Sequence, residues 1–204
     1  MGSGLSLDGV EAVRLEEVLA AHFAEYRRRR LPLWSNPTPV PVSEGIAPWP
    51  HDPGPPFAQW PGLAAGMPVT SADATPEEAA SGLLTELIQT RPFGLDFCRL
   101  VLVPARRGSD ALALIDWSAE APLALLCALL RSWEDRFGAQ IVAVFGSEVY
   151  VSVARPPADT GQADQLALEH VRSTADNIVN APPTPFPEYA RQPVGRPSWS
   201  FWWD

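Results

Sequence analysis

Hydrophobic residues recur at spacings of three and four in three parts of the chain, which is typical of amphipathic helices. The first stripe covers residues 7–30, the second begins after Pro122, and the third covers residues 163–179. The second stripe is the strongest and ends at Gly138, a residue type that commonly terminates helices. Its apolar face consists of Leu126, Leu129, Leu130, Trp133 and Phe137. The pattern therefore predicts helices at 7–30, 122–137 and 163–179.

Two shorter helices are predicted from their N-terminal signals. Thr75 is followed by proline and then by glutamate three positions on, the arrangement of a capped helix start, and the helix is expected to run to about Gln89. Ser109 and Asp110 can cap a helical turn that extends through Ile115.

Strand patterns lie between these helices. Residues 97–103 are rich in β-prone side chains and end at a proline, which predicts a strand. Residues 140–145 form a continuous apolar run, and residues 149–153 alternate apolar and polar positions after Gly146. These two segments predict a hairpin.

The chain ends on an aromatic segment. Alternation places Trp199, Phe201 and Trp203 on one strand face and Trp202 on the other. The three-residue face is expected to close a core. The alternative is a recognition surface, in which Trp202, Trp199 and Trp49 are the candidate contact residues for a partner or for a second copy of the chain.

Between residues 32 and 68 the chain contains eleven of its 23 prolines, so regular helix or central strand is not expected there. The same segment holds four large aromatic residues, which a solvated linker rarely carries. These are Trp34, Trp49, Phe57 and Trp60. We expect an extended arm that docks on the body; a polyproline ligand is the alternative, since two PxxP spacings occur at residues 50–56.

Together these elements predict an α+β fold. The expected sheet is small, mixed or antiparallel, with helices packed mainly on one face. The expected division is an N-terminal helix at 1–31, a Pro/Trp-rich arm at 32–74 and an α+β core domain at 75–204.

The net charge of −9 argues against nucleic-acid binding, which depends on cations that neutralise phosphates. The run Arg27–Arg30 fits the negative end of a helix, and a docking patch for an acidic partner is the alternative. No apolar stretch is long enough to cross a bilayer and no signal peptide is recognisable, so a cytoplasmic protein without membrane contact is expected.

Motifs for phosphate loops, dinucleotide binding, zinc proteases and serine hydrolases are absent from the sequence, so we assign no cofactor, metal or catalytic residue. One polar cluster stands out on the last predicted helix. His170 and Asn177 flank its apolar face, whereas Glu169 and Asp176 are expected on the solvated side. A salt-bridged surface is one interpretation, and a polar cleft centred on His170 is the other.

Several segments together resemble a known family. They are Arg131–Ala139, Ser152–Pro157, Glu169-His170, Asp176-Asn177 and the ending Trp-x-Phe-Trp-Trp-Asp. They resemble the uncharacterised bacterial family named domain of unknown function 4253, over about residues 95–204. The resemblance implies a shared architecture and bacterial origin and supplies no activity. Members often carry Cys-Pro before the Asp-Asn pair, where this chain has Thr174-Ala175.

The leading hypothesis is a non-enzymatic binding or regulatory module, such as an immunity-type protein that blocks a toxin. Acidic charge, missing catalytic signatures and the aromatic arm and tail favour it. The alternative is a small enzyme or small-ligand binder that uses the His170 cleft. A protein partner and a homo-oligomer are both compatible with the sequence.

Overall fold

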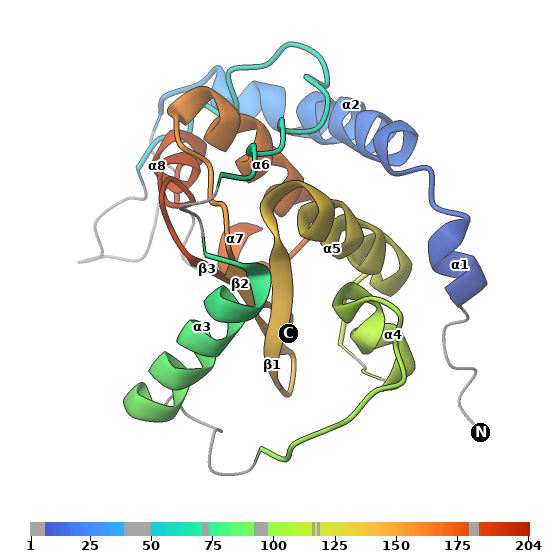
Figure 1. Cartoon of the computed structure of the whole chain (residues 1–204). Coiled ribbons are helices and arrows are strands. Elements are labelled where there is room, and N and C mark those ends of the chain that lie inside the picture. The colour runs from blue at the N-terminus through green and yellow to red at the C-terminus, as the bar shows by residue number, and fades with distance from the viewer. Residues whose placement is uncertain are drawn as a thin grey trace, which may run out of the picture.

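The predicted hairpin lies at the centre of the molecule (Figure 1). The computed structural model describes residues 7–38, 50–70, 74–91, 98–115, 117, 119–179 and 184–204. β1 (Ala139–Phe145) pairs antiparallel with β2 (Glu148–Val153), and β3 (Ser198–Trp202) pairs antiparallel with the other edge of β2. Within the described residues the strand order is β1-β2-β3. The predicted α+β fold is confirmed.

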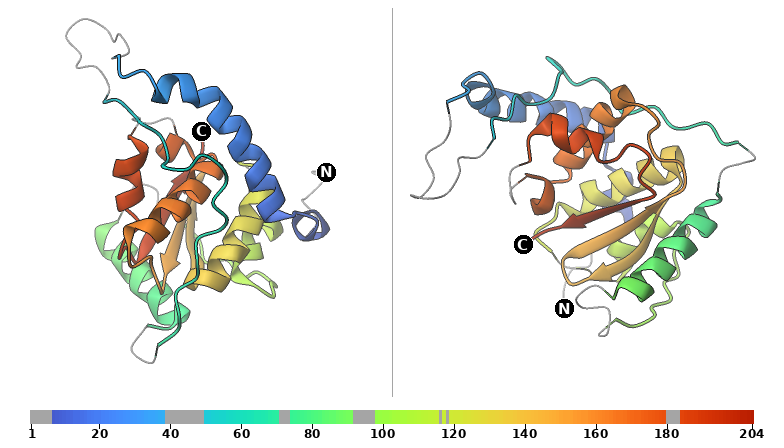
Figure 2. Two further views of the ribbon diagram at one scale, coloured as in Figure 1. Left: turned by 90° about the horizontal axis from the view of Figure 1, so that it is seen from above. Right: turned by 90° about the vertical axis from the view of Figure 1, so that its left-hand side faces the viewer.

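Helices cover both faces of this sheet unequally (Figure 2). Most of them, with α5 and α6 innermost, pack on the face that holds the main core, whereas α3 packs on β1 and β2 from the opposite side. In chain order, the helical elements are α1 (Leu7–Glu11), α2 (Leu15–Trp34), α3 (Pro76–Thr90), the 3-10 helix η2 (Gly108–Asp110), α4 (Ala111–Leu114), α5 (Leu123–Phe137), α6 (Thr160–Arg172), α7 (Asp176–Val179) and α8 (Phe186–Arg191).

The aromatic tail completes the core, as its alternation predicts. Trp199, Phe201 and Trp203 are buried, and the Phe201 ring stacks on Trp133 of α5 at a centroid distance of 5.3 Å. Trp199 meets Trp133 edge to face at 5.7 Å. Because these rings belong to the chain's own core, they are not available as a surface for another molecule.

Local signals set the ends of α3 and α5. Thr75 and Glu78 form a reciprocal capping box at the start of α3, as expected. α5 ends at Gly138, whose φ of +62° lies in the left-handed region that favours glycine. An added Cβ there would lie 3.0 Å from the Ala154 Cβ, so the turn into β1 also needs the missing side chain.

The N-terminal and C-terminal helices differ from their predictions. The predicted helix at 7–30 is two helices, and α2 continues through Pro32 to Trp34. Pro32 removes the helical hydrogen bond to the Arg28 carbonyl, and the helix ends two residues later. The predicted helix at 163–179 is interrupted after Arg172, where Thr174 adopts a φ of +64° and ends α6.

The strand predicted at 97–103 is wrong for residues 98–103, which are described and form no strand. Phe97 lies outside the described residues. Leu100 and Leu102 are 92% and 89% exposed. The β-prone composition reflects local preference only, whereas a strand needs a neighbouring strand, and the sheet of the described residues consists of β1, β2 and β3 alone.

Residues 50–70 run over α2 and α6 in an extended path (Figure 2). Gly54 presses against the indole of Trp34, and the side chains of Gln162 and Gln165 donate to the backbone carbonyls of Ala65 and Pro61. The predicted arm therefore contacts the body over these residues. The division of the chain into three domains stays a prediction.

Candidate functional site

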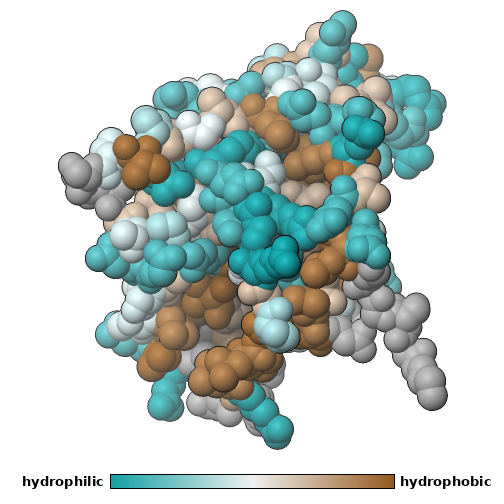
Figure 3. All heavy atoms as spheres, turned by 45° about the vertical axis from the view of Figure 1, so that its right-hand side comes forward, coloured by the Kyte–Doolittle hydropathy of each residue, from teal (hydrophilic) through white to brown (hydrophobic). Residues whose placement is uncertain are grey.

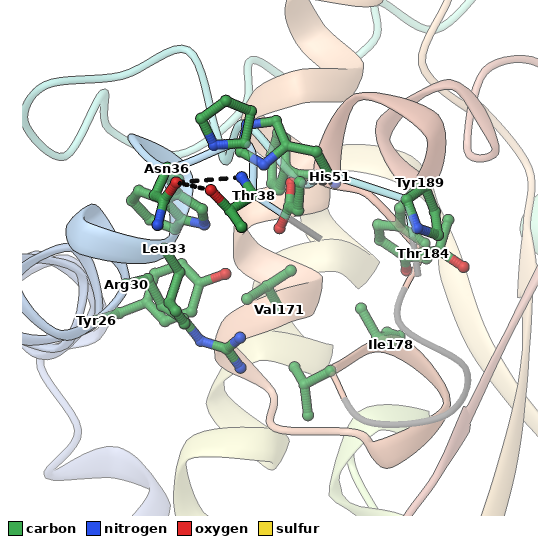
Figure 4. Close-up of a pocket in the computed structure, with 16 residues that line it drawn as sticks. Tyr26, Arg30, Leu33, Asn36, Thr38, His51, Val171, Ile178, Thr184 and Tyr189 are labelled. Carbon is green, nitrogen blue, oxygen red and sulfur yellow. Dashed lines mark hydrogen bonds between the residues drawn. The ribbon is translucent and has the colours of Figure 1, made fainter. Parts of the chain in front are cut away.

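A cavity lies among the described residues where α2, the arm and α6–α8 meet (Figure 4). Its volume is about 400 Å³, within the range of small-molecule sites. The lining residues come from segments far apart in the sequence: Tyr26, Arg30, Leu33, Trp34, Asn36, Pro37, Thr38, Pro50, His51, Asp52, Val171, Ile178, Val179, Thr184, Phe186 and Tyr189.

The wall of this pocket is mainly apolar and aromatic. Tyr26 and Trp34, eight positions apart on α2, meet edge to face with ring centroids 5.3 Å apart. Figure 4 shows Tyr26 and Arg30 directed from α2 toward Val171 of α6, with Ile178 of α7 beside it. A flat apolar molecule would therefore meet rings on one side and aliphatic groups on the other.

Polar groups lie around this wall, and most are held by neighbours. The Asn36 side-chain oxygen Oδ1 accepts from the backbone N–H and the hydroxyl of Thr38. Asp52 Oδ1 accepts from the backbone N–H groups of Gly54 and Phe186, both at 2.8 Å, and so ties the arm to α8. Burial raises the pKa of Tyr26, so its hydroxyl stays protonated at neutral pH.

A smaller cavity lies beside the predicted His170 cluster and has a volume of about 160 Å³. His170 and Asn177 both line it, and Tyr189 lines both cavities. The remaining lining residues are Gln192, Pro193, Arg196, Ser198, Trp199 and Ser200. The structure thus brings two of the four predicted cleft residues to one cavity.

His170 forms part of the wall but is itself only 1% exposed. Its Nδ1 is 2.9 Å from the Tyr189 hydroxyl, and its Nε2 has no hydrogen-bond partner among the described residues. The rings of Trp133, Trp199 and Phe201 surround the imidazole at centroid distances of 4.6 to 5.0 Å. Burial, with a smaller effect of Arg136, lowers the His170 pKa to about 3, so the ring is neutral at neutral pH.

Asn177 hydrogen-bonds the edge of β3 that does not pair with β2. Its amide nitrogen donates to the Ser200 carbonyl and its amide oxygen accepts from the Trp202 backbone N–H, both at 3.0 Å. The side chain therefore pairs with β3 as a neighbouring strand would. Asp176, the next predicted residue, accepts from the Asp204 backbone N–H at 2.9 Å and does not line either cavity.

Glu169 is completely buried, so its expected place on the solvated side of the helix is wrong. Its carboxylate accepts from Trp133 Nε1 and the Ala64 backbone N–H, both at 2.8 Å, and forms an ion pair with Arg136 at 2.6 Å. Arg136 also donates to the Ala64 carbonyl. Glu169 thus joins α5, α6 and the arm, and all its described contacts are structural.

Of the three tryptophans predicted as a recognition surface, the structure describes Trp199 and Trp202, which lie on opposite faces of β3. Trp199 is buried in the core, and Trp202 is partly exposed on the opposite face of the sheet. Trp49 lies outside the described residues.

Sequence reasoning missed the residues of the larger pocket. The arginine run 27–30 is a candidate docking patch in the sequence, and Arg30 is the one of these four residues that lines the cavity. No sequence pattern connects Arg30 with Asp52 or Tyr189, because the five segments that form the pocket meet only in the folded chain.

The described residues hold no cluster of three His, Cys, Asp or Glu side chains arranged for a metal ion. Likewise, no helix in the described part of the chain is long and apolar enough to cross a membrane.

Comparison with known proteins gives one result. The family described as "Domain of unknown function (DUF4253)" matches residues 99–204, half of the chain. Neither a curated protein nor a solved structure matches. The matched residues include β1, β2, β3, α5 and α6, together with the buried Trp133 and Glu169 and the exposed Asn177. Segments that carry the resemblance in sequence lie among them. The chain belongs to the DUF4253 family.

Proposed function

We propose that the chain is a non-enzymatic binding module whose larger pocket binds a small amphipathic ligand. The pocket itself is the observation that supports this most, because a cavity of about 400 Å³ with an apolar wall and a few polar groups is typical of small-molecule sites. A regulatory role would follow if ligand binding changes how the arm, α2 and α8 pack around the pocket.

The alternative, a small enzyme that uses His170, has less support. General acid–base catalysis works best when the catalytic pKa lies near the working pH, and the His170 pKa is about 3. Its Nδ1 contacts the hydroxyl of Tyr189, whose pKa is raised by burial, and Glu169 is engaged with Arg136. No side chain within the described cluster is thereby activated as a nucleophile.

The test is a screen of small amphipathic compounds against the full chain by ligand-observed NMR. Leu33→Trp should abolish binding, because Leu33 lines the pocket and the larger ring would fill its mouth. Leu31→Trp is the matched control, since Leu31 is also exposed on α2 but does not line the pocket. Hits that bind both variants equally, or a screen without hits, would contradict the proposal.

A second candidate function is the binding of a protein partner, as an immunity-type protein does. It is favoured by the exposed run Leu100, Val101 and Leu102. In Figure 1 this segment runs along the bottom of the molecule, and Figure 3 shows hydrophobic side chains gathered low on the face that it draws. Such apolar groups favour a partner with an apolar surface of its own.

Partner binding can be tested by pull-down from native lysate with the wild-type chain and a Leu100→Ser, Leu102→Ser double variant. A protein retained by the wild type and lost with the variant is expected. Identical captures by both chains, or light scattering that shows only self-association through this run, would contradict this second candidate.

A further inference from the structure

Two arginines beside the larger pocket lack an acidic partner among the described residues. Arg30 lines the pocket and takes part in no ion pair or hydrogen bond there. Its neighbours on α2 differ, because Arg28 and Arg29 both pair with Glu25. Arg30 is therefore the member of the arginine run that is available to a ligand.

The second unpaired cation is Arg172 at the end of α6. Its guanidinium carbon lies 4.9 Å from the centroid of the Tyr26 ring, and Tyr26 lines the pocket. Arg172 Nε is buried and has no hydrogen-bond partner among the described residues. Burial lowers the pKa of Arg172, which indicates that its charge is poorly solvated and would be stabilised by a nearby anion.

Negative charge at the pocket is limited in comparison. Asp52 is the one acidic residue in the described lining, and its Oδ1 already accepts two backbone N–H groups. The chain as a whole carries a net charge of −9, so a pocket edge with two unpaired arginines contrasts with its acidic average. A bound anion would balance this local excess of positive charge.

We propose that the ligand of the larger pocket is an aromatic carboxylic acid whose carboxylate binds Arg30. The rings of Tyr26, Trp34 and Phe186 in the lining favour a flat apolar body, and Arg30 supplies the two parallel N–H groups that match a carboxylate. Arg172 adds positive potential through the Tyr26 side of the pocket. This inference rests on the proposed function and names the class of its ligand.

A ligand with a single negative charge is favoured over a phosphate dianion, because only the Arg30 guanidinium lines the cavity among the described residues. The Arg172 guanidinium lies against the Tyr26 ring. Figure 4 shows the Arg30 guanidinium directed toward the space in front of Val171, where a carboxylate would lie between polar and apolar walls. The apolar body would then extend toward α7 and α8.

The test compares 3-phenylpropionate with 3-phenylpropionamide by isothermal titration calorimetry on the full chain. The two probes share shape and differ in charge. The acid should bind at least about tenfold more tightly, since a charge-assisted hydrogen bond contributes more than a neutral one. Arg30→Gln should remove this difference, and raising the salt concentration should reduce it.

Arg27→Gln is the matched control, because Arg27 belongs to the same run but does not line the pocket, and it should leave both affinities unchanged. If the acid and the amide bind equally, or if Arg30→Gln leaves the affinity for the acid unchanged, the carboxylate inference is wrong. The proposed small-molecule binding function would still be supported by such a result. If neither probe binds and uncharged compounds do, the inference also fails. If no compound of any kind binds, the proposed function fails with it.

Discussion

Glu169 is the residue through which three segments of the chain are joined. It is buried and forms an ion pair with the partly buried Arg136, and it also accepts hydrogen bonds from Trp133 and the Ala64 backbone. A helical wheel places Glu169 on the solvated side, because charged residues are rarely buried. The pattern of one helix cannot show that an arginine from α5 reaches this carboxylate. The sequence therefore singles out Glu169 as a candidate residue but does not predict its three partners.

Replacing this carboxylate tests its structural role. Glu169→Gln should lower the free energy of unfolding by about 3 kcal/mol, because it breaks an ion pair whose carboxylate is completely buried and leaves the partly buried Arg136 without its counter-ion. Urea denaturation followed by circular dichroism measures the loss. Glu134→Gln is the control, since Glu134 pairs with Arg107 at a more exposed position. Equal, small losses in both variants would contradict the structural role of Glu169.

The buried imidazole of His170 makes stability depend on pH in a defined direction. Its pKa is about 3 in the fold and 6.5 ordinarily, so between these values the unfolded chain binds more protons than the folded chain. The His170 contribution to stability is therefore fully present above pH 6.5 and is lost as the pH falls toward 3, by up to about 1.4 kcal/mol per pH unit.

NMR checks this directly. The His170 ring signals should not titrate between pH 8 and pH 5, because burial holds the His170 pKa at about 3. A His170 midpoint near 6 would contradict the account and would restore this residue as a candidate acid or base.

At the scale of elements, the helices and strands with complete local signals were predictable. The capping box of α3, the glycine stop of α5 and the hairpin β1–β2 all follow from residues within a few positions of one another. The conformation of residues 98–103 was not predictable in this way, because a β-prone sequence becomes a strand only if the edge of a sheet pairs with it. The break before α7 depends on the positive φ of Thr174, a residue type that rarely adopts it.

The contact between the arm and α2 can be tested at Gly54. Gly54→Ala should loosen the arm, because the new Cβ would lie 2.3 Å from the Trp34 ring. Gly62→Ala is a matched control: both glycines have positive φ, but nothing lies within 4 Å of the added Cβ at Gly62. Both variants carry backbone strain, and only Gly54→Ala should also show faster proteolysis of the arm. Equal cleavage rates would contradict this contact.

At the scale of the whole molecule, the last residues are as important as the core helices. Deleting residues 199–204 removes three buried aromatic side chains, each worth about 3–5 kcal/mol. The truncated chain should lack a cooperative thermal transition. Deleting residue 204 alone removes an exposed side chain and should leave the transition nearly unchanged. Circular dichroism measures both, and a cooperative transition in the longer deletion would contradict the role of the tail.

The two cavities show where prediction from sequence ends. The cluster around His170 was recognisable because its members lie close together on one stretch of chain, and two of them line one cavity. The larger pocket takes residues from α2, the arm and α6–α8, so only the packing of these elements creates it. Local patterns carry no information about such a meeting point.

The pocket between α2, the arm and α6–α8 is the proposed ligand site of this chain. A crystal structure of the full chain grown with the tightest-binding compound from the screen would show whether the ligand lies there. We expect ligand density against Tyr26, Val171 and Phe186, with any acidic group beside Arg30. Density only at other sites, or none at saturating ligand, would contradict this proposal.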